Sequence, residues 1–197
     1  YLAMSFVVFC VGALVFWLVG FALMFGGSKL TPGLSSGNQF VGYSGFLLLG
    51  NSYDVSTAML WMFQIMFAAT ACTIVTGAVA ERFKFHAYVL YSVFLCGVLY
   101  PIFGHWMWGK GWLEMLPFGV GARDFAGSGV VHGIGGLIAF VAAWMTGPRY
   151  GKYNPDGSSN VIHGHNLLYI VMGTLILIFG WFGFNAGSTL AVTELRV

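Results

Sequence analysis

The chain has very little charge. Only 7% of its 197 residues are Asp, Glu, Lys or Arg, whereas soluble domains carry about 25%. Its net charge is +2 and it has no run of basic residues, so it lacks the electrostatic footprint of a nucleic-acid-binding protein. Hydrophobic residues make up 58% of the sequence. This composition excludes an ordinary soluble domain and predicts a protein embedded in a lipid bilayer.

Cysteines and catalytic patterns are also scarce. Cys10, Cys72 and Cys96 lie in apolar stretches without metal-ligand spacing, and we interpret them as small buried hydrophobic residues. The sequence contains no phosphate-binding loop, no paired carboxylates and no cluster of metal ligands. His163 and His165 alternate in a polar loop and could meet a metal, but no further ligand accompanies them. We therefore expect no enzyme, no cofactor and no metal centre.

Five stretches of the chain contain no charged residue, and each can hold an apolar helix of about 20 residues, enough to cross a hydrocarbon core of about 30 Å. We expect transmembrane helices over approximately residues 3–25, 58–80, 86–106, 125–146 and 166–187. The predicted fold class is therefore all-α, a polytopic transmembrane helix bundle. Residues 1–197 are expected to form a single, partial membrane domain, because both ends of the sequence lie in or just beyond apolar runs.

The basic residues suggest an orientation. Two short loops, 81–85 and 147–165, hold half of these residues close to the spans, whereas the other loops hold the same number over a far longer stretch. Cytoplasmic loops carry an excess of Lys and Arg. By density of basic residues, loops 81–85 and 147–165 are therefore predicted to face the cytoplasm.

Two ionisable residues stand out near the fourth expected span. Asp124 opens the segment Asp-Phe-Ala-Gly-Ser-Gly-Val-Val-His that ends at His132. A carboxylate here is expected to accept the free N–H groups of the first helical turn, with attraction of cations as an additional role. A histidine in an apolar span either bonds a backbone carbonyl or lines a pore. Ionisable groups are costly at membrane depth, which favours the pore for His132.

Aromatic side chains supply the remaining candidates. Phe63 and Phe67 are one helical turn apart and are expected to stack on one face. A group of tryptophans at the end of the third span is explained either as an interfacial belt, which spacing alone favours, or as a cation–π site. This group consists of Trp106, Trp108 and Trp112. Phe184 and Ser188 share a helical face, with Asn185 beside them.

Three motifs together resemble the ammonium transporter/Rhesus superfamily, and more closely its ammonium transporter branch. The first is Met-Phe-Gln-Ile-Met-Phe at 62–67 followed by Gly-Ala-Val-Ala-Glu-Arg at 77–82. The second is the segment from Asp124 to His132, and the third is Gly-Trp-Phe-Gly-Phe-Asn-Ala-Gly-Ser at 180–188. Their order and spacing are similar to the family over essentially the whole chain.

The resemblance implies an eleven-helix fold built from inverted repeats of five helices, assembled as a homotrimer in the plasma membrane or the bacterial inner membrane. This chain would supply about helices two to six, so the partner of His132 would lie in the other repeat. The implied partners are ammonium or ammonia, the lipid bilayer and a regulatory protein on the cytoplasmic face, but no nucleic acid.

The resemblance also implies roles for individual residues. An outer recruitment site would comprise Trp108, Phe67 and Ser188, with Phe63 nearby, and the gate below it Phe67 and Phe184. His132 would line the pore, and Asp124 and Asn185 would have structural or electrostatic roles. Lys110, next to the recruitment site, is expected to point away from it, because a cation there would repel ammonium.

The expected function is transport of ammonium, with NH4+ recruited by cation–π contacts and NH3 conducted, with or without its proton, through a hydrophobic pore. One alternative is an ammonium-sensing membrane module of a signalling protein. Another is a Rhesus-type gas channel, but Trp108 and Ser188 argue against it, since they suit the binding of a cation.

Overall fold

The computed structural model describes residues 2–193, whose regular secondary structure is helical. Within these residues the only β-type pairings are two isolated bridges, Gly37 with Gly42 and Tyr153 with Ser159. The chain divides into two compact units, residues 1–147 and 148–197.

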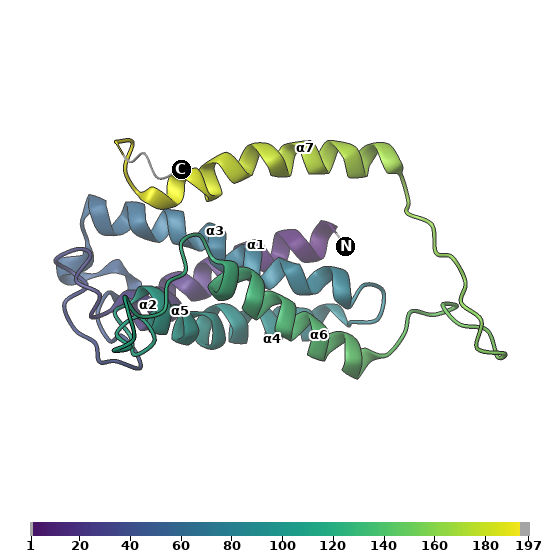
Figure 1. The fold of residues 1–197 in the computed structure, drawn as a ribbon, viewed down its shortest axis with the longest axis horizontal. Helices are drawn as coiled ribbons and strands as arrows, with labels where there is room; N and C mark the ends of the chain where they lie inside the picture. Colours follow the sequence, from purple (N-terminus) through teal and green to yellow (C-terminus); the bar gives the residue numbers. More distant parts are fainter. Residues whose placement is uncertain (1, 194–197) are drawn as a thin grey trace. The chain divides into compact units, whose positions relative to one another are not determined.

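The first unit holds four spans, and three of them are built from shorter helical segments (Figure 1). The first span comprises α1 (Leu2–Val15), η1 (Phe16–Gly20) and α2 (Phe21–Phe25). The second is α3 (Val55–Ala78), and the third comprises α4 (Phe85–Phe94), η4 (Leu95–Leu99) and α5 (Tyr100–Trp108). The fourth comprises η5 (Ser128–Gly133) and α6 (Ile134–Thr146). Short 3-10 turns, η2 (Phe46–Leu48) and η3 (Gly50–Ser52), lie in the first loop.

Local capping sets the helix boundaries and shifts two of them from the expected positions. The second span begins at Val55 rather than residue 58, because the Asp54 carboxylate accepts the backbone N–H of Thr57 at 2.9 Å. The fourth span begins at Ser128 rather than residue 125, since the cap formed by Asp124 leaves the intervening residues outside the helix. Gly147 ends α6 with a φ of 72°, a left-handed conformation that glycine adopts without steric cost.

Three of the four spans in this unit contain a π-helical segment, η1, η4 or η5. Pro101 follows η4 and has no backbone N–H, so it cannot complete the regular hydrogen-bond ladder there. A Cβ on Gly20 in η1 would lie 2.3 Å from the carbonyl oxygen of Cys96 in η4. The two π-helical segments therefore pack backbone against backbone, and only glycine fits at this point.

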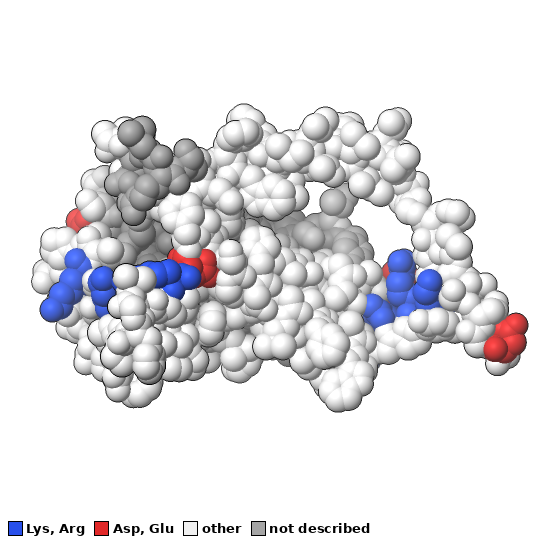
Figure 2. Space-filling view, in the orientation of Figure 1, with Lys and Arg blue, Asp and Glu red and all other residues white. Residues whose placement is uncertain are grey.

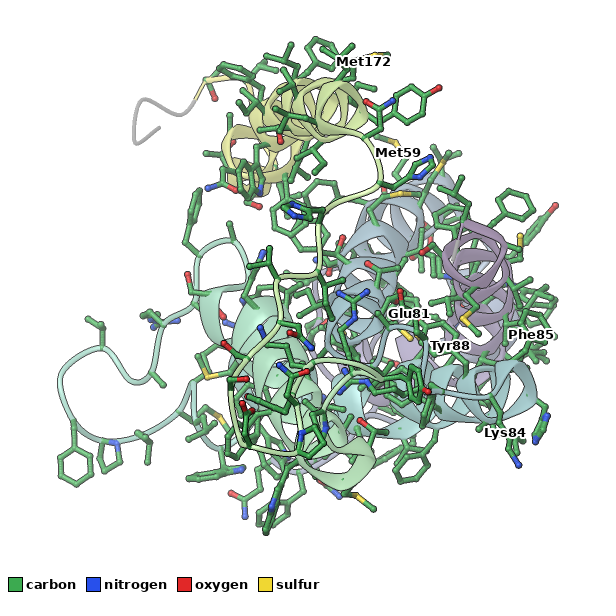
Figure 3. The ribbon with its side chains drawn as sticks, turned by 90° about the vertical axis from the view of Figure 1, so that its right-hand side faces the viewer. Met59, Glu81, Lys84, Phe85, Tyr88 and Met172 are labelled. Atoms are coloured by element: carbon green, nitrogen blue, oxygen red, sulfur yellow. The ribbon has the colours of Figure 1, made fainter. Side chains whose placement is uncertain are left out.

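The loops of the first unit meet in pairs at its two ends. At one end, the loop before α3 and the loop after α5 are joined by a hydrogen bond from the backbone N–H of Trp112 to the carbonyl of Gln39, at 2.9 Å. At the other end, Arg82 donates to the carbonyl of Gly147. Figure 3 shows Glu81 and Lys84 at this end, in the turn after α3; Tyr88 is fully buried, and Phe85 is 48% exposed.

The second unit contains a polar loop, α7 (Leu167–Phe184) and the 3-10 turn η6 (Ala186–Thr189). Asn166 caps α7 by accepting the N–H of Leu168 at 2.9 Å. In total, five helices of the described chain are long and apolar enough to cross a membrane: 2–25, 55–78, 85–108, 128–146 and 167–189. The visible charges in Figure 2 lie over the connecting segments, and the helical surface between them is uncharged.

Candidate functional site

An aromatic cluster forms where α3 meets the end of α5. Phe63 and Phe67 lie one turn apart on α3, with ring centroids 4.8 Å apart. The ring of Trp108 meets Phe67 edge to face at 5.9 Å and an interplanar angle of 86°. Phe67 is only 2% exposed, whereas Phe63 and Trp108 are half-buried. The cluster thus brings two phenylalanine rings and one indole into contact, and aromatic rings of these types can bind a cation over their faces.

The tryptophans at this end do not form one group. Trp106 packs against Trp112, with ring centroids 5.7 Å apart, and against Phe103 at 6.0 Å. Its indole N–H donates to the carbonyl of Phe40 at 2.9 Å. Trp106 and Trp112 therefore fasten the loops to each other, and Trp108 alone joins the Phe63–Phe67 pair.

Asp124 shapes the start of the fourth span. One carboxylate oxygen accepts the N–H groups of Gly127 and Ser128, at 2.7 and 2.9 Å, and the other accepts those of Gly129 and Val130, both at 2.8 Å. Four N–H groups at a helix start would otherwise lack partners. The carboxylate satisfies all four, and its negative charge opposes the partial positive charge of the helix N-terminus.

The same residue holds the indole of Trp108. The backbone carbonyl of Asp124 accepts the Nε1–H of Trp108 at 2.6 Å. An indole has only this one donor, so its orientation is fixed by the bond. Asp124 therefore links the aromatic cluster to η5. Its backbone carbonyl binds the Trp108 indole, and its carboxylate binds the N–H groups at the start of η5.

His132 lies in the last turn of η5. Its Nδ1 is 3.3 Å from the carbonyl oxygen of Gly127, and the residue is exposed. Gly127 itself has a φ of 100°, and a Cβ there would lie 2.5 Å from the side chain of Val131. The tight turn at Gly127 thus places His132 just beyond the capped helix start.

The remaining predicted residues lie in the second unit. Phe184 is the last residue of α7, Asn185 follows it, and Ser188 lies in η6. The hydroxyl of Ser188 donates to the carbonyl of Phe184 at 2.5 Å, and its backbone N–H donates to the carbonyl of Asn185 at 3.1 Å. The hydroxyl uses its one hydrogen in this bond, and its oxygen can still accept a hydrogen bond from another donor.

Lys110 belongs to a small charge cluster that the sequence analysis did not identify. Its ammonium lies 3.3 Å from Oε1 of Glu114, and the guanidinium of Arg123 lies 3.1 Å from the same oxygen. The spacing of four residues between Lys110 and Glu114 is one at which opposite charges often pair, so this contact could have been predicted from the sequence. Nothing in the sequence pairs Arg123 with Glu114.

His105 is a second residue that the sequence analysis missed. It is fully buried, with Nδ1 2.8 Å from the carbonyl oxygen of Met24 and Nε2 2.7 Å from that of Asn38. It thereby ties α5 to the end of α2 and to the first loop. The signal that singled out His132, an ionisable side chain in an apolar span, applies equally to His105.

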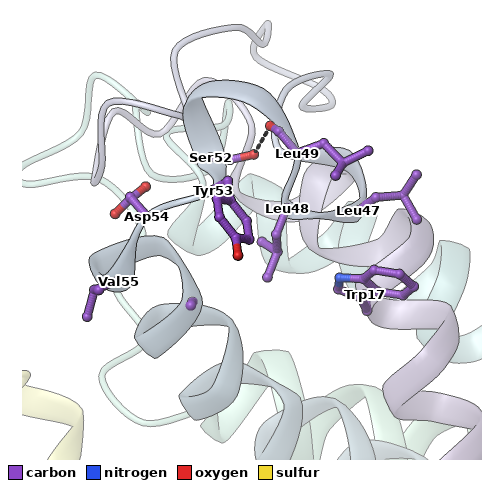
Figure 4. Close-up of a pocket in the computed structure, with 9 residues that line it drawn as sticks. Trp17, Leu47, Leu48, Leu49, Ser52, Tyr53, Asp54 and Val55 are labelled. Carbon is purple, nitrogen blue, oxygen red and sulfur yellow. Dashed lines mark hydrogen bonds between the residues drawn. The ribbon is translucent and has the colours of Figure 1, made fainter.

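Two surface cavities lie in the first unit. One, of about 540 Å³, is lined by apolar parts of α5, η5 and α6. The other, of about 500 Å³, lies between Trp17 and the segment from Leu47 to Val55, where the hydroxyl of Ser52 bonds the carbonyl of Leu49 at 2.6 Å (Figure 4). Within residues 2–193 no three His, Cys, Asp or Glu side chains are grouped to hold a metal.

The family model and the similar proteins all point to ammonium transporters. The model of the Ammonium Transporter Family matches residues 1–197. The chain is 54% identical over 195 residues to ammonium transporter Amt2 of Archaeoglobus fulgidus, covering 96% of this chain and 40% of that protein. It is 44% identical over 186 residues to ammonium transporter 1 member 3 of Solanum lycopersicum, covering 90% and 38%.

A solved structure shows the same fold. The crystal structure of Candida albicans Mep2 matches with a TM-score of 0.74 at 33% identity, over 92% of this chain and 39% of that one. The chain therefore spans about 40% of the length of its relatives. The relatives are named as ammonium transporters rather than enzymes, and the chain is a multi-pass membrane protein. By the match along its whole length, the chain belongs to the ammonium transporter family.

Proposed function

We propose that this chain forms part of a transporter that recruits NH4+ at Trp108 and Phe67 and passes NH3, with or without its proton, along a pore lined by His132. The observation that carries the proposal is the fixed edge-to-face contact of Trp108 with Phe67. Ammonium and potassium ions are of similar size, so radius alone separates them poorly. Aromatic faces combined with hydrogen-bond acceptors add directional contacts that favour NH4+ over a spherical ion.

The other predicted residues extend this site. Ser188 would contribute an acceptor oxygen, with Asn185 supporting the turn that carries it, and Phe63 would complete the aromatic wall. Phe67 and Phe184 would form the gate. A bare cation crossing such an apolar gate loses its hydration at great cost, so loss of the proton before the gate is favourable. His132, one of few ionisable groups at membrane depth, would then exchange hydrogen bonds with ammonia.

The proposal is tested by ammonium uptake into proteoliposomes containing a full-length transporter that includes this chain. A desolvated cation–π contact contributes about 2 kcal/mol, or about 30-fold in affinity. Trp108→Ala is therefore expected to raise the half-saturating ammonium concentration by about 10- to 30-fold. Trp108→Phe keeps an aromatic face and should cost less. His132→Ala should lower the maximal rate more than the affinity.

The double variant Trp108→Ala, His132→Ala gives the decisive result. Uptake at the affinity and rate of the unmodified protein would show that these site assignments are wrong. Thermal stability of each purified variant serves as the control, because a loss of transport has meaning only where the fold persists.

A further inference from the structure

The loop between Trp108 and Asp124 carries a cluster whose role goes beyond the proposed recruitment site. We name it the Glu114 clamp and define it as Lys110, Glu114 and Arg123. We propose that Glu114 is a positioning residue for Trp108, because its carboxylate joins the two stretches of loop that fix the indole. The inference rests on the proposed function, in which Trp108 binds ammonium.

The first stretch held by Glu114 directly follows Trp108. α5 ends at Trp108, and Lys110 adopts a left-handed conformation with a φ of 65°. That conformation is unfavourable for a residue with a side chain. Oε2 of Glu114 accepts the backbone N–H of Lys110 at 3.1 Å, and the N–H of Glu114 donates to the carbonyl of Trp106 at 3.0 Å. Glu114 therefore stabilises the turn that ends the helix just after Trp108.

The second stretch directly precedes Asp124. Oε1 of Glu114 accepts a hydrogen bond from the guanidinium of Arg123 at 3.1 Å. Beside it, the N–H of Ala122 donates to the carbonyl of Leu113 at 3.0 Å. The next residue after Arg123 is Asp124, whose carbonyl holds the indole of Trp108 at 2.6 Å. A closed circuit of contacts thus runs from Trp108 through Asp124, Arg123 and Glu114 back to the end of α5.

An isolated surface ion pair contributes little, and this is the simplest alternative explanation of the cluster. Two features distinguish the Glu114 clamp from such a pair. The Glu114 side chain is only 12% exposed, against 58% for Lys110 and 59% for Arg123. Its two oxygens accept three donors, one of them a backbone N–H, so the carboxylate has a defined geometry. Charge-assisted bonds in such a network are stronger than single exposed ones.

Charge offers a second route by which Glu114 could affect ammonium. Without the Glu114 carboxylate, the positive charges of Lys110 and Arg123 would be uncompensated and would repel NH4+ through space. The test must therefore separate positioning of Trp108 from simple electrostatic repulsion.

The first measurement is ammonium uptake by a full-length transporter carrying Glu114→Gln, which keeps the side-chain size but removes the charge. We expect the half-saturating concentration to rise about three- to tenfold, as for the loss of a small charge network, with the maximal rate within about twofold. Glu114→Asp should lie between this variant and the unmodified protein. Asp156→Asn removes one negative charge from the exposed loop of the second unit and should have no effect.

The second measurement repeats Glu114→Gln in a Trp108→Ala background. If Glu114 acts through Trp108, the two effects are not additive and Glu114→Gln changes little further. An equal rise in both backgrounds overturns the proposal, and its disappearance in high salt would identify electrostatic repulsion as the cause. An unchanged affinity of Glu114→Gln in the unmodified background overturns it as well.

A third measurement does not depend on transport. With 5-fluorotryptophan incorporated, the fluorine resonance of Trp108, assigned by its absence in Trp108→Phe, reports the surroundings of the indole. Glu114→Gln should shift or broaden it, and Asp156→Asn should not. If the unmodified full-length protein does not carry ammonium but Glu114→Gln still shifts the Trp108 resonance, the proposed function is refuted and the positioning role of Glu114 is retained. An unchanged resonance would refute positioning whatever the transport result.

Discussion

Several polar side chains of this protein lie at the starts of helices, where they accept backbone N–H groups. Asp54 and Asn166 each accept N–H groups at the first turn of the helix that follows, and Asp124 accepts four. In a bilayer, free N–H groups are far more costly than in water. A carboxylate or amide next to an apolar run therefore has a structural use before any function is considered. In the proposed function Asp124 would serve both purposes, because its backbone carbonyl also binds the indole of Trp108.

Asp54 supplies a prediction at the residue scale. Hydrogen bonds from the hydroxyl and then the N–H of Thr57 lower the pKa of Asp54 below its ordinary value of 3.8. Because the folded-state pKa is depressed, the cap contributes fully above pH 3.8 and is lost as the pH falls through the lower folded-state pKa. A carboxyl-carbon NMR titration should give a midpoint below 3.8. Thr57→Val removes the hydroxyl and should return the midpoint towards 3.8.

The backbone N–H of residue 57 is unchanged in Thr57→Val, so part of the depression should remain in that variant. Equal midpoints in the two proteins would mean that the hydroxyl does not set the pKa. Asp156, whose pKa is also lowered, by Ser158, serves as an internal reference that Thr57→Val should not move.

Among the helical elements, the π-helical segments are the feature that decides packing. Each adds a residue to a helical turn, which shifts the faces on either side of it. Pro101 accounts for η4, and the contact of Gly20 with the Cys96 carbonyl shows that η1 and η4 fit each other. The helix that ends in Trp108 is therefore placed by a backbone contact about three turns before that tryptophan.

Gly20→Ala tests this contact. The new Cβ would lie 2.3 Å from a backbone oxygen, which cannot move aside as a flexible side chain can. Overpacking of this kind costs about 1–3 kcal/mol, so the thermal unfolding temperature of the detergent-solubilised full-length protein should fall. Gly136→Ala in α6 is the matched control, since nothing lies within 4 Å of its added Cβ. Equal unfolding temperatures for the two variants would contradict the account of the packing.

For the molecule as a whole, the arrangement of the loops predicts its orientation in the membrane. Hydrogen bonds join the first and third loops at one end of the first unit and join Arg82 to Gly147 at the other. This arrangement is the alternation that four successive spans require. The density of Lys and Arg in loops 81–85 and 147–165 predicts that their end faces the cytoplasm.

Thiol labelling of a full-length transporter in intact cells tests the orientation. Ser35→Cys, in the first loop, should react with a membrane-impermeant reagent from outside. Ser159→Cys should react only after permeabilisation. The unmodified protein is the control, because Cys10, Cys72 and Cys96 lie within the spans. The reverse labelling pattern would show that the density of basic residues misleads here.

The sequence by itself determined the features that depend on short stretches of chain. Five spans follow from the length of the uncharged runs. The stacking of Phe63 on Phe67 follows from a spacing of one turn, and capping by Asp124 follows from its place before an apolar helix. Family membership, too, followed from three motifs along the chain and is confirmed by the match over its whole length.

Only the tertiary structure decided which of several equivalent residues meet. Spacing alone treats Trp106 and Trp108 alike, and only the family resemblance favoured Trp108. In the structure, Trp106 connects the loops and Trp108 contacts Phe67. As ionisable residues in apolar spans, His105 and His132 are also alike, yet His105 is fully buried between two carbonyls. The pairing of Arg123 with Glu114 likewise depends on a loop folding back upon itself. These contacts join residues that are distant in sequence, so no local spacing or propensity encodes them.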